Sequence, residues 1–490
     1  LQRQISAQWA SLSAGTQNGV ITGSATDGPR TVIDDLRAAR AAIMEEIEEK
    51  FPDYAEIINP SRISIDGVRN LLRQDERLLS VYMGDRTTFV WSISKSDAAK
   101  MYVIDRSRDE MDWLIADVHQ GLDPTGISTI GDIPEFNVTA AHELFQVLFG
   151  EDSKRWRRSE TLIYIPHSSL STLPLAVLPI TAGRKPERKT LLFSEYRDIE
   201  WIINVFDIAT LPSVSSLRSL RKTAKSQTAQ LNFVGFGDPI FSEQKQNGPA
   251  APATRGAVLR GGGFLFRSAP ATKQMRSANL GDLPQLPSTG DEIRELALVM
   301  NADPTRDLFL GVRASEESVK SAFLNGYKVI AFATHGLVSG DLDGLRQPAL
   351  ALSSPGFTGG KEDGLLTMDE IMALRLDADW VILSACNTGA ADGSGAEAIS
   401  GLGGAFFYAG ARALFVTYWP VETTSAQMIT TELFRRQSKN ASLTRSEATR
   451  QAYRFLIEHE GFKTESGEIA FSYAHPIFWA AFGLIGLPES

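Results

Sequence analysis

Three near-continuous apolar runs in the C-terminal half constrain the fold of this chain more than any other feature. The runs are Lys328–Ala333, Trp380–Ala385 and Ala413–Tyr418, and helical patterns separate them. Strands without polar alternation belong to parallel sheets that helices cover on both faces. The sequence therefore predicts an α/β fold with a mostly parallel central sheet over residues 289–490.

Two helices are expected before the first of these runs. One begins near Ser288 or Thr289 and passes through Glu292 to Met300. The other follows Ser315, where the helix dipole favours the two acids of the first turn.

The preceding half of the chain mixes strand and helix patterns. Apolar segments on either side of Gly84-Asp85-Arg86 predict a hairpin. An amphipathic helix is expected over Thr31–Glu49, of the kind that ends a helical repeat array. The other expected elements are strands at Met101–Ile104, Leu162–Pro166 and Phe233–Pro239, and helices at Asp109–Gln120 and Ala140–Phe149.

Composition divides the chain into four regions. Residues 1–50 are expected to be a helical lead-in that ends a longer helical region, and residues 51–240 an α/β region. Residues 241–288 are rich in Gly, Pro, Ala, Ser and Gln, and are basic with no acid between Gln244 and Gly281. This composition predicts a mobile, solvated loop, with a processing site or a docking loop as the alternative. Residues 289–490 form the second α/β region.

Charge and cysteine content exclude several classes of protein. The 490 residues include 49 Lys and Arg against 59 Asp and Glu, a net charge of −10, which argues against a general binder of nucleic acids or anionic membranes. Cys386 is the only cysteine, which excludes an internal disulfide and a two-thiolate zinc site, and a reducing cytoplasm is expected.

No secretory leader is recognised. The apolar window 399–421 contains Arg412 and Pro420, so a buried helix and strand are expected there instead of a membrane span.

Two reactive side chains stand at the carboxyl ends of apolar strands. His335 follows the first run in Ala333-Thr334-His335-Gly336, and Cys386 follows the second in Ser384-Ala385-Cys386. Active sites of open parallel sheets lie at this edge. Each residue taken alone would be an ordinary core side chain. The two together, at consecutive strand ends and beside small residues, indicate a thiol–imidazole pair.

Such a pair performs acyl transfer. A thiolate attacks a carbonyl carbon, while the imidazole manages the protons and lowers the thiol pKa. The tetrahedral oxyanion needs backbone N–H donors, and the amides of Gly336 and Cys386 are the natural candidates. This chemistry requires neither a metal nor a cofactor.

These residues lie within a set of motifs that resembles the CHAT family of caspase-like cysteine proteases. A His-Gly followed by Ala-Cys about 50 residues downstream is also the caspase arrangement. The matching stretches, spread over about residues 50–487, are Leu162–Pro179 (LIYIPHSSLSTLPLAVLP), Phe233–Pro239 (FVGFGDP), Ala333–Gly336 (ATHG), Gly364–Leu374 (GLLTMDEIMAL), Val381–Gly389 (VILSACNTG), Tyr418–Pro420 (YWP) and His475–Gly486 (HPIFWAAFGLIG).

The resemblance implies a caspase-like three-layer fold in residues 289–490, preceded by a related, non-catalytic pseudo-caspase half in residues 51–240 and an N-terminal helix. It also implies that His335 is the general base or acid and that Cys386 is the nucleophile. Gly336 and Cys386 would line the oxyanion hole. Relatives often carry tetratricopeptide helices on the N-terminal side.

The residue two positions before the cysteine differs from that of several basic-specific relatives, which have Asp where this chain has Ser384. A neutral hydroxyl offers no ion pair to a basic substrate side chain. Other candidates for the substrate pocket are the acids Asp341, Asp343, Asp363 and Glu422, each of which is otherwise a solvated loop acid.

The favoured function is a cytoplasmic cysteine endopeptidase that cleaves a specific protein partner. Its activity is expected to be gated by an activating protein, a complex or an upstream region. A catalytically inactive peptide-binding scaffold with the same fold is the alternative. A nucleotide-binding protein is disfavoured, since Gly356–Glu362 is one residue short of a phosphate loop and Gly393–Ala398 begins too far from its strand. No direct nucleic-acid, membrane, metal or cofactor binding is expected.

Overall fold

The computed structural model describes residues 63–127, 129–150, 161–181, 189–222, 229–242, 266, 279–384, 394–464 and 466–489, with the backbone alone for 394–400. The chain divides into two compact units, Leu1–Ile63 and Ser64–Ser490, and the fold is that of the second. The helix predicted at Thr31–Glu49 and most of the basic loop at 241–288 lie outside the described residues.

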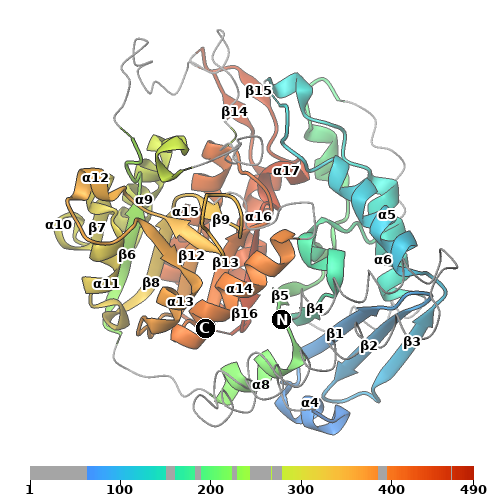
Figure 1. The fold of residues 1–490 in the computed structure, drawn as a ribbon. Coiled ribbons are helices and arrows are strands. Elements are labelled where there is room, and N and C mark those ends of the chain that lie inside the picture. Colours follow the sequence, from blue (N-terminus) through green and yellow to red (C-terminus); the bar gives the residue numbers. More distant parts are fainter. Residues whose placement is uncertain are drawn as a thin grey trace, which may run out of the picture. The chain divides into compact units, whose positions relative to one another are not determined.

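One large sheet runs through the described part of the second unit. Its eleven strands lie in the order β3-β2-β1-β4-β5-β16-β13-β12-β8-β6-β7 (Figure 1). Neighbours are parallel from β1 to β16 and from β13 to β7, and antiparallel at β3–β2, β2–β1 and β16–β13. The predicted mostly parallel sheet and the hairpin are therefore confirmed. The strands are β1 (Glu76–Met83), β2 (Thr88–Ser94), β3 (Lys100–Ile104), β4 (Thr161–Ile165), β5 (Asp207–Thr210), β6 (Leu231–Gly237), β7 (Leu308–Leu310), β8 (Tyr327–Ala333), β12 (Trp380–Leu383), β13 (Ala413–Thr417) and β16 (Phe482–Gly486).

Two smaller sheets accompany the large one. The first contains three strands in the order β11-β10-β9, and the second pairs β14 with β15. Their strands are β9 (Gly336–Leu337), β10 (Ala349–Ala351), β11 (Leu365–Thr367), β14 (Phe462–Lys463) and β15 (Ile469–Phe471).

The helices begin where the sequence provides N-terminal caps. Pro287 opens α9 (Pro287–Val299), and the Ser315 side chain accepts from the Ser318 amide at the start of α11 (Glu316–Ser321). The helix after Ser315 begins where it was expected. The expected cap at Ser288 or Thr289 is wrong, because α9 begins earlier, with Leu286 at the N-cap position and no side-chain cap. The other α-helices are α4 (Ile65–Leu71), α5 (Arg108–Gln120), α6 (Val138–Phe149), α8 (Val214–Lys222), α10 (Pro304–Asp307), α12 (Pro355–Thr358), α13 (Met368–Ala373), α14 (Ser394–Ala409), α15 (Thr423–Lys439), α16 (Arg445–Glu458) and α17 (Pro476–Trp479).

Helices cover both faces of the sheet around its central strands. In β8, Val329, Ala331 and Ala333 lie in one apolar cluster with side chains of α9, α15 and α16. Ile330 and Phe332 lie in a second cluster with side chains of α11, α13 and α14. Successive residues of a strand point to opposite faces, so an unbroken apolar strand fills both cores at once. The predicted three-layer arrangement is confirmed.

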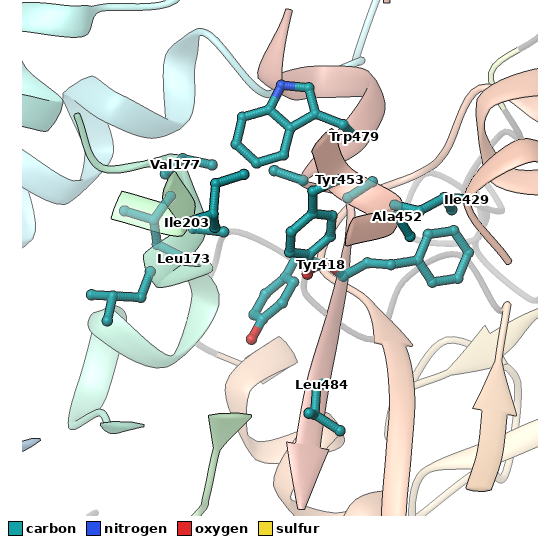
Figure 2. Close-up of a cluster of buried hydrophobic side chains, with 14 of the residues drawn as sticks. Leu173, Val177, Ile203, Tyr418, Ile429, Ala452, Tyr453, Trp479 and Leu484 are labelled. Carbon is teal, nitrogen blue, oxygen red and sulfur yellow. Dashed lines mark hydrogen bonds between the residues drawn. The ribbon is translucent and has the colours of Figure 1, made fainter. Parts of the chain in front are cut away.

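The C-terminal strand joins the two halves of the sequence. β16 pairs with β13 along its length and with β5 through a single residue pair. Beside it, Leu173, Val177 and Ile203 share one buried cluster with Tyr453 and Trp479 (Figure 2). In addition, β6 of the first half lies between β8 and β7 of the second. The two predicted α/β regions therefore share one sheet and the apolar cluster on one of its faces.

The apolar window at residues 399–421 belongs to α14 and β13, as expected. Among the described residues, no helix combines the length and the apolar character that crossing a bilayer requires.

His475 connects the two halves through Nε2 and is oriented locally through Nδ1. The side chain is fully buried at the N-terminus of α17. Its Nδ1 accepts from the Ile477 amide at 3.1 Å, and its Nε2 donates to the Pro134 carbonyl at 3.0 Å. The first contact requires a lone pair on Nδ1, so the ring must be neutral. Burial lowers the pKa of His475 to about 3.

We expect acid to weaken the fold through His475. The imidazole takes up a proton near pH 6.5 in the unfolded chain, whereas the folded protein keeps it neutral down to about pH 3. The free energy of unfolding therefore falls below pH 6.5, by about 2 kcal/mol at about pH 5 from this group alone. Urea unfolding at about pH 7.5 and about pH 5 measures this loss, and His475→Asn, which does not titrate, should lose about 2 kcal/mol less than wild type. Equal losses in the two proteins would contradict the role of His475.

Candidate active site

His335 lies two residues after the end of β8, at the carboxyl edge of the sheet. Its ring is fully buried. Nε2 lies 2.6 Å from the carbonyl oxygen of Pro284, and the ring centroid lies 5.6 Å from that of Phe241. A carbonyl only accepts, so Nε2 carries the proton and Nδ1 carries the lone pair of the neutral ring. The imidazole is thus held in one tautomer and one orientation.

Gly336 begins β9 directly after the imidazole. It pairs with Leu350 of β10, and the Ala351 amide donates to the His335 carbonyl at 2.9 Å. This bonding pattern makes Gly336 and Leu350 a non-hydrogen-bonded pair of the antiparallel ladder. The Gly336 amide therefore faces away from β10.

Ser384 follows β12, which pairs in parallel with β8. Its amide donates to the Phe332 carbonyl at 3.0 Å. Its side chain is buried, and the hydroxyl donates to Oε2 of Glu292 at 3.1 Å. Cys386 lies outside the described residues, within the segment 385–393. The structure thus brings Ser384 beside the strand end that carries the imidazole.

Glu292 is a functional candidate that the sequence pattern alone did not single out. It lies in α9 with 1% of its surface exposed. A signal was present, because Leu296 and Val299 follow it at helical spacing and place the acid on the apolar face. A carboxylate in a buried stripe needs hydrogen-bond partners, since burying an unsatisfied charge is strongly unfavourable.

The four acids expected near the substrate pocket have other surroundings. Asp341 is buried and accepts from the Val338 amide at 2.8 Å, which closes a turn. Glu422 caps α15 by accepting two amides of its first turn, and burial raises its pKa. Asp343 and Asp363 are exposed, and Asp363 accepts from a backbone amide two residues along. The described hydrogen bonds of these acids go to local backbone, not to the imidazole or to the end of β12.

Three carboxylates that could hold a cation surround a lysine. Oxygens of Glu316, Glu362 and Glu370 lie within 4.8 Å of one another. The Lys320 ammonium contacts them at 2.6, 2.7 and 2.8 Å, respectively, and so supplies the positive charge. Burial raises the pKa of Glu316 to about 7. Glu370 also forms the capping box of α13 with Thr367, so the cluster anchors the small sheet at β11.

The family model described as CHAT domain matches residues 138–487. Comparison with curated proteins gives no match. Two similar solved structures are of the Saccharomyces cerevisiae separase–securin complex, at 13% and 12% identity and a TM-score of 0.34 each. The matched regions cover 99% and 96% of this chain but only 28% and 26% of the chains in those two structures. This chain therefore spans little more than a quarter of their length.

Replacing Lys320 with Met should destabilise the fold in a pH-dependent way. Three mutually repelling carboxylates remain, and we expect the free energy of unfolding to fall by about 2 kcal/mol at about pH 8. Without the ammonium, the folded variant binds protons more readily than its unfolded chain, so the deficit should shrink as the pH falls towards about 5. Urea unfolding of both proteins across this range measures the deficit. A deficit that stays constant or grows on acidification would count against the cluster.

Proposed function

Because the chain belongs to the CHAT domain family, we propose that it is a caspase-like cysteine endopeptidase with His335 and Cys386 as its catalytic dyad. One observation carries the proposal. The buried His335 ring, held through Nε2 by the Pro284 carbonyl, lies at a strand end whose parallel neighbour leads to the only cysteine. A base and a nucleophile are both needed for acyl transfer, and this edge of a parallel sheet is where they would meet.

His335 receives the thiol proton at Nδ1, because Nε2 already donates to the Pro284 carbonyl. The imidazolium keeps the hydrogen bond from Nε2 to the Pro284 carbonyl, and the positive charge of the ring strengthens it. The thiolate of Cys386 then attacks the carbonyl carbon of the substrate peptide and forms a tetrahedral adduct.

The adduct oxygen carries a negative charge that backbone amides stabilise. The proposed donors are Gly336, whose amide faces away from β10, and Cys386. The imidazolium gives its Nδ1 proton to the leaving amine, and the peptide bond breaks. The same imidazole then deprotonates a water molecule that attacks the thioester carbon. The carbon–sulfur bond breaks, the carboxylic acid product leaves, and the imidazolium returns the proton to the Cys386 sulfur.

The proposed substrate is a specific protein, and the proposed location is the cytoplasm, where a lone thiol stays reduced. Residues 51–240 act as the non-catalytic half that completes the sheet and the core. Gating by a partner, a complex or the region before residue 50 keeps such an endopeptidase from acting without a signal. Ser384 and the acids Asp341, Asp343, Asp363 and Glu422 remain candidates for the substrate pocket.

The single cysteine allows the dyad to be tested without a substrate. The rate of iodoacetamide labelling is measured against pH by intact mass, so every label reports on Cys386. We expect wild type to react well below the free-thiol pKa of about 8.5, and His335→Ala to react about tenfold more slowly near pH 7. The imidazole causes this difference by stabilising the thiolate.

A slow reaction that His335→Ala leaves unchanged would sink the dyad and favour the inactive scaffold. His142 of α6, whose Nδ1 donates to the Pro179 carbonyl at 3.0 Å, provides the matched control. His142→Ala also removes a histidine that contacts a carbonyl, and it should label like wild type.

A further inference from the structure

A buried carboxylate reaches the end of the strand that leads to the proposed nucleophile. Glu292 projects from α9, and its Oε2 lies 3.1 Å from the Ser384 hydroxyl. Both residues are about 1% exposed. Water has little access to this buried contact, so the hydrogen bond is stronger than the same contact on the surface.

The end of β12 is therefore held from two sides. The Ser384 amide donates to the Phe332 carbonyl of β8, and the Ser384 side chain donates to Glu292 of α9. The first bond continues the sheet, and the second ties the strand end to the helix layer. Cys386 follows two residues later in the sequence.

The segment that begins α9 also holds the imidazole. Pro284, eight residues before Glu292 in the sequence, accepts from His335 Nε2. The same segment is fastened to the end of β6, since the Asp238 amide donates to the Thr289 hydroxyl at 2.8 Å. Gln285 donates to the Asp238 carboxylate at 3.0 Å. One short segment thus contacts both strand ends of the site while being hydrogen-bonded to a third.

We propose that Glu292 is a positioning residue of the active site, and that Pro284–Glu292 is a bracket that sets the imidazole and the nucleophile's strand end relative to each other. This inference rests on the proposed function. It goes beyond the dyad because it assigns the alignment of the two reacting groups to a helix that carries neither of them. Small displacements of reacting groups are enough to slow acyl transfer severely.

The test compares three variants by the iodoacetamide reaction of the full chain, with folding checked by thermal melting and near-ultraviolet circular dichroism. Glu292→Ala removes the acceptor, and we expect labelling near pH 7 to slow about tenfold. Glu292→Gln keeps an acceptor oxygen and should restore most of the lost rate. Ser384→Ala removes the donor of the same hydrogen bond and should also slow labelling. It tests the contact independently if Glu292→Ala does not fold.

Glu432→Ala is the matched control, because Glu432 is also buried but accepts from Arg435 and Arg436 on α15. It should lower stability without changing the rate or the pH profile of labelling. If Glu292 had only a structural role, Glu292→Ala would likewise lower stability and leave the rate and pH profile of labelling unchanged.

The outcomes separate this inference from the dyad. Slow labelling of Glu292→Ala and Ser384→Ala, with rescue by Gln and no effect of Glu432→Ala, supports the bracket. Wild-type rates and pH profiles in folded Glu292→Ala and Ser384→Ala overturn it, even where His335→Ala is slow and the dyad stands. Labelling that is indifferent to His335 removes the dyad, and the bracket with it.

Discussion

The parallel pairing of β8 with β12 is the constraint on which the candidate active site depends. Both strands are buried on both faces, and their register sets Leu383 opposite Phe332. A slip of one residue would move every side chain of a strand to the other core, so the register is strongly specified. The two strands therefore end side by side, which brings Ser384 next to the end of β8.

Packing alone does not orient an imidazole, and here polar contacts from two directions complete the site. The lead-in to α9 supplies the Pro284 carbonyl to His335 on one side. On the other, Gly336 enters the three-stranded sheet, which the carboxylate cluster around Lys320 supports through β11. The Pro284 support comes from 51 positions earlier in the sequence, so the orientation of the imidazole depends on tertiary contacts. His475 and β16 connect the first half of the chain to the second, so both halves fold as one unit.

Much of this fold could be predicted from the sequence, because buried apolar residues recur with the period of a helix or a strand. The hairpin, the apolar strands and the helix after Ser315 follow from local spacing and caps, and the existence of α9 follows from its apolar spacing. The pocket acids were harder to interpret. A carboxylate that caps a helix, such as Glu422, cannot be distinguished by sequence from one that faces a substrate. Glu292 was missed for a related reason. Its position on an apolar helix face indicated burial, but nothing local indicated its partner.

The sequence by itself determined the class of fold and the placement of His335 and Cys386 after buried strands, because side-chain periodicity and strand ends are local properties of the chain. Only the tertiary structure decided that β16 closes the sheet between β5 and β13, and that Glu292 meets Ser384 across 92 positions of sequence. Strand order and such buried hydrogen bonds depend on which distant surfaces can be desolvated together. That is a property of the assembled cores, and no single segment contains it.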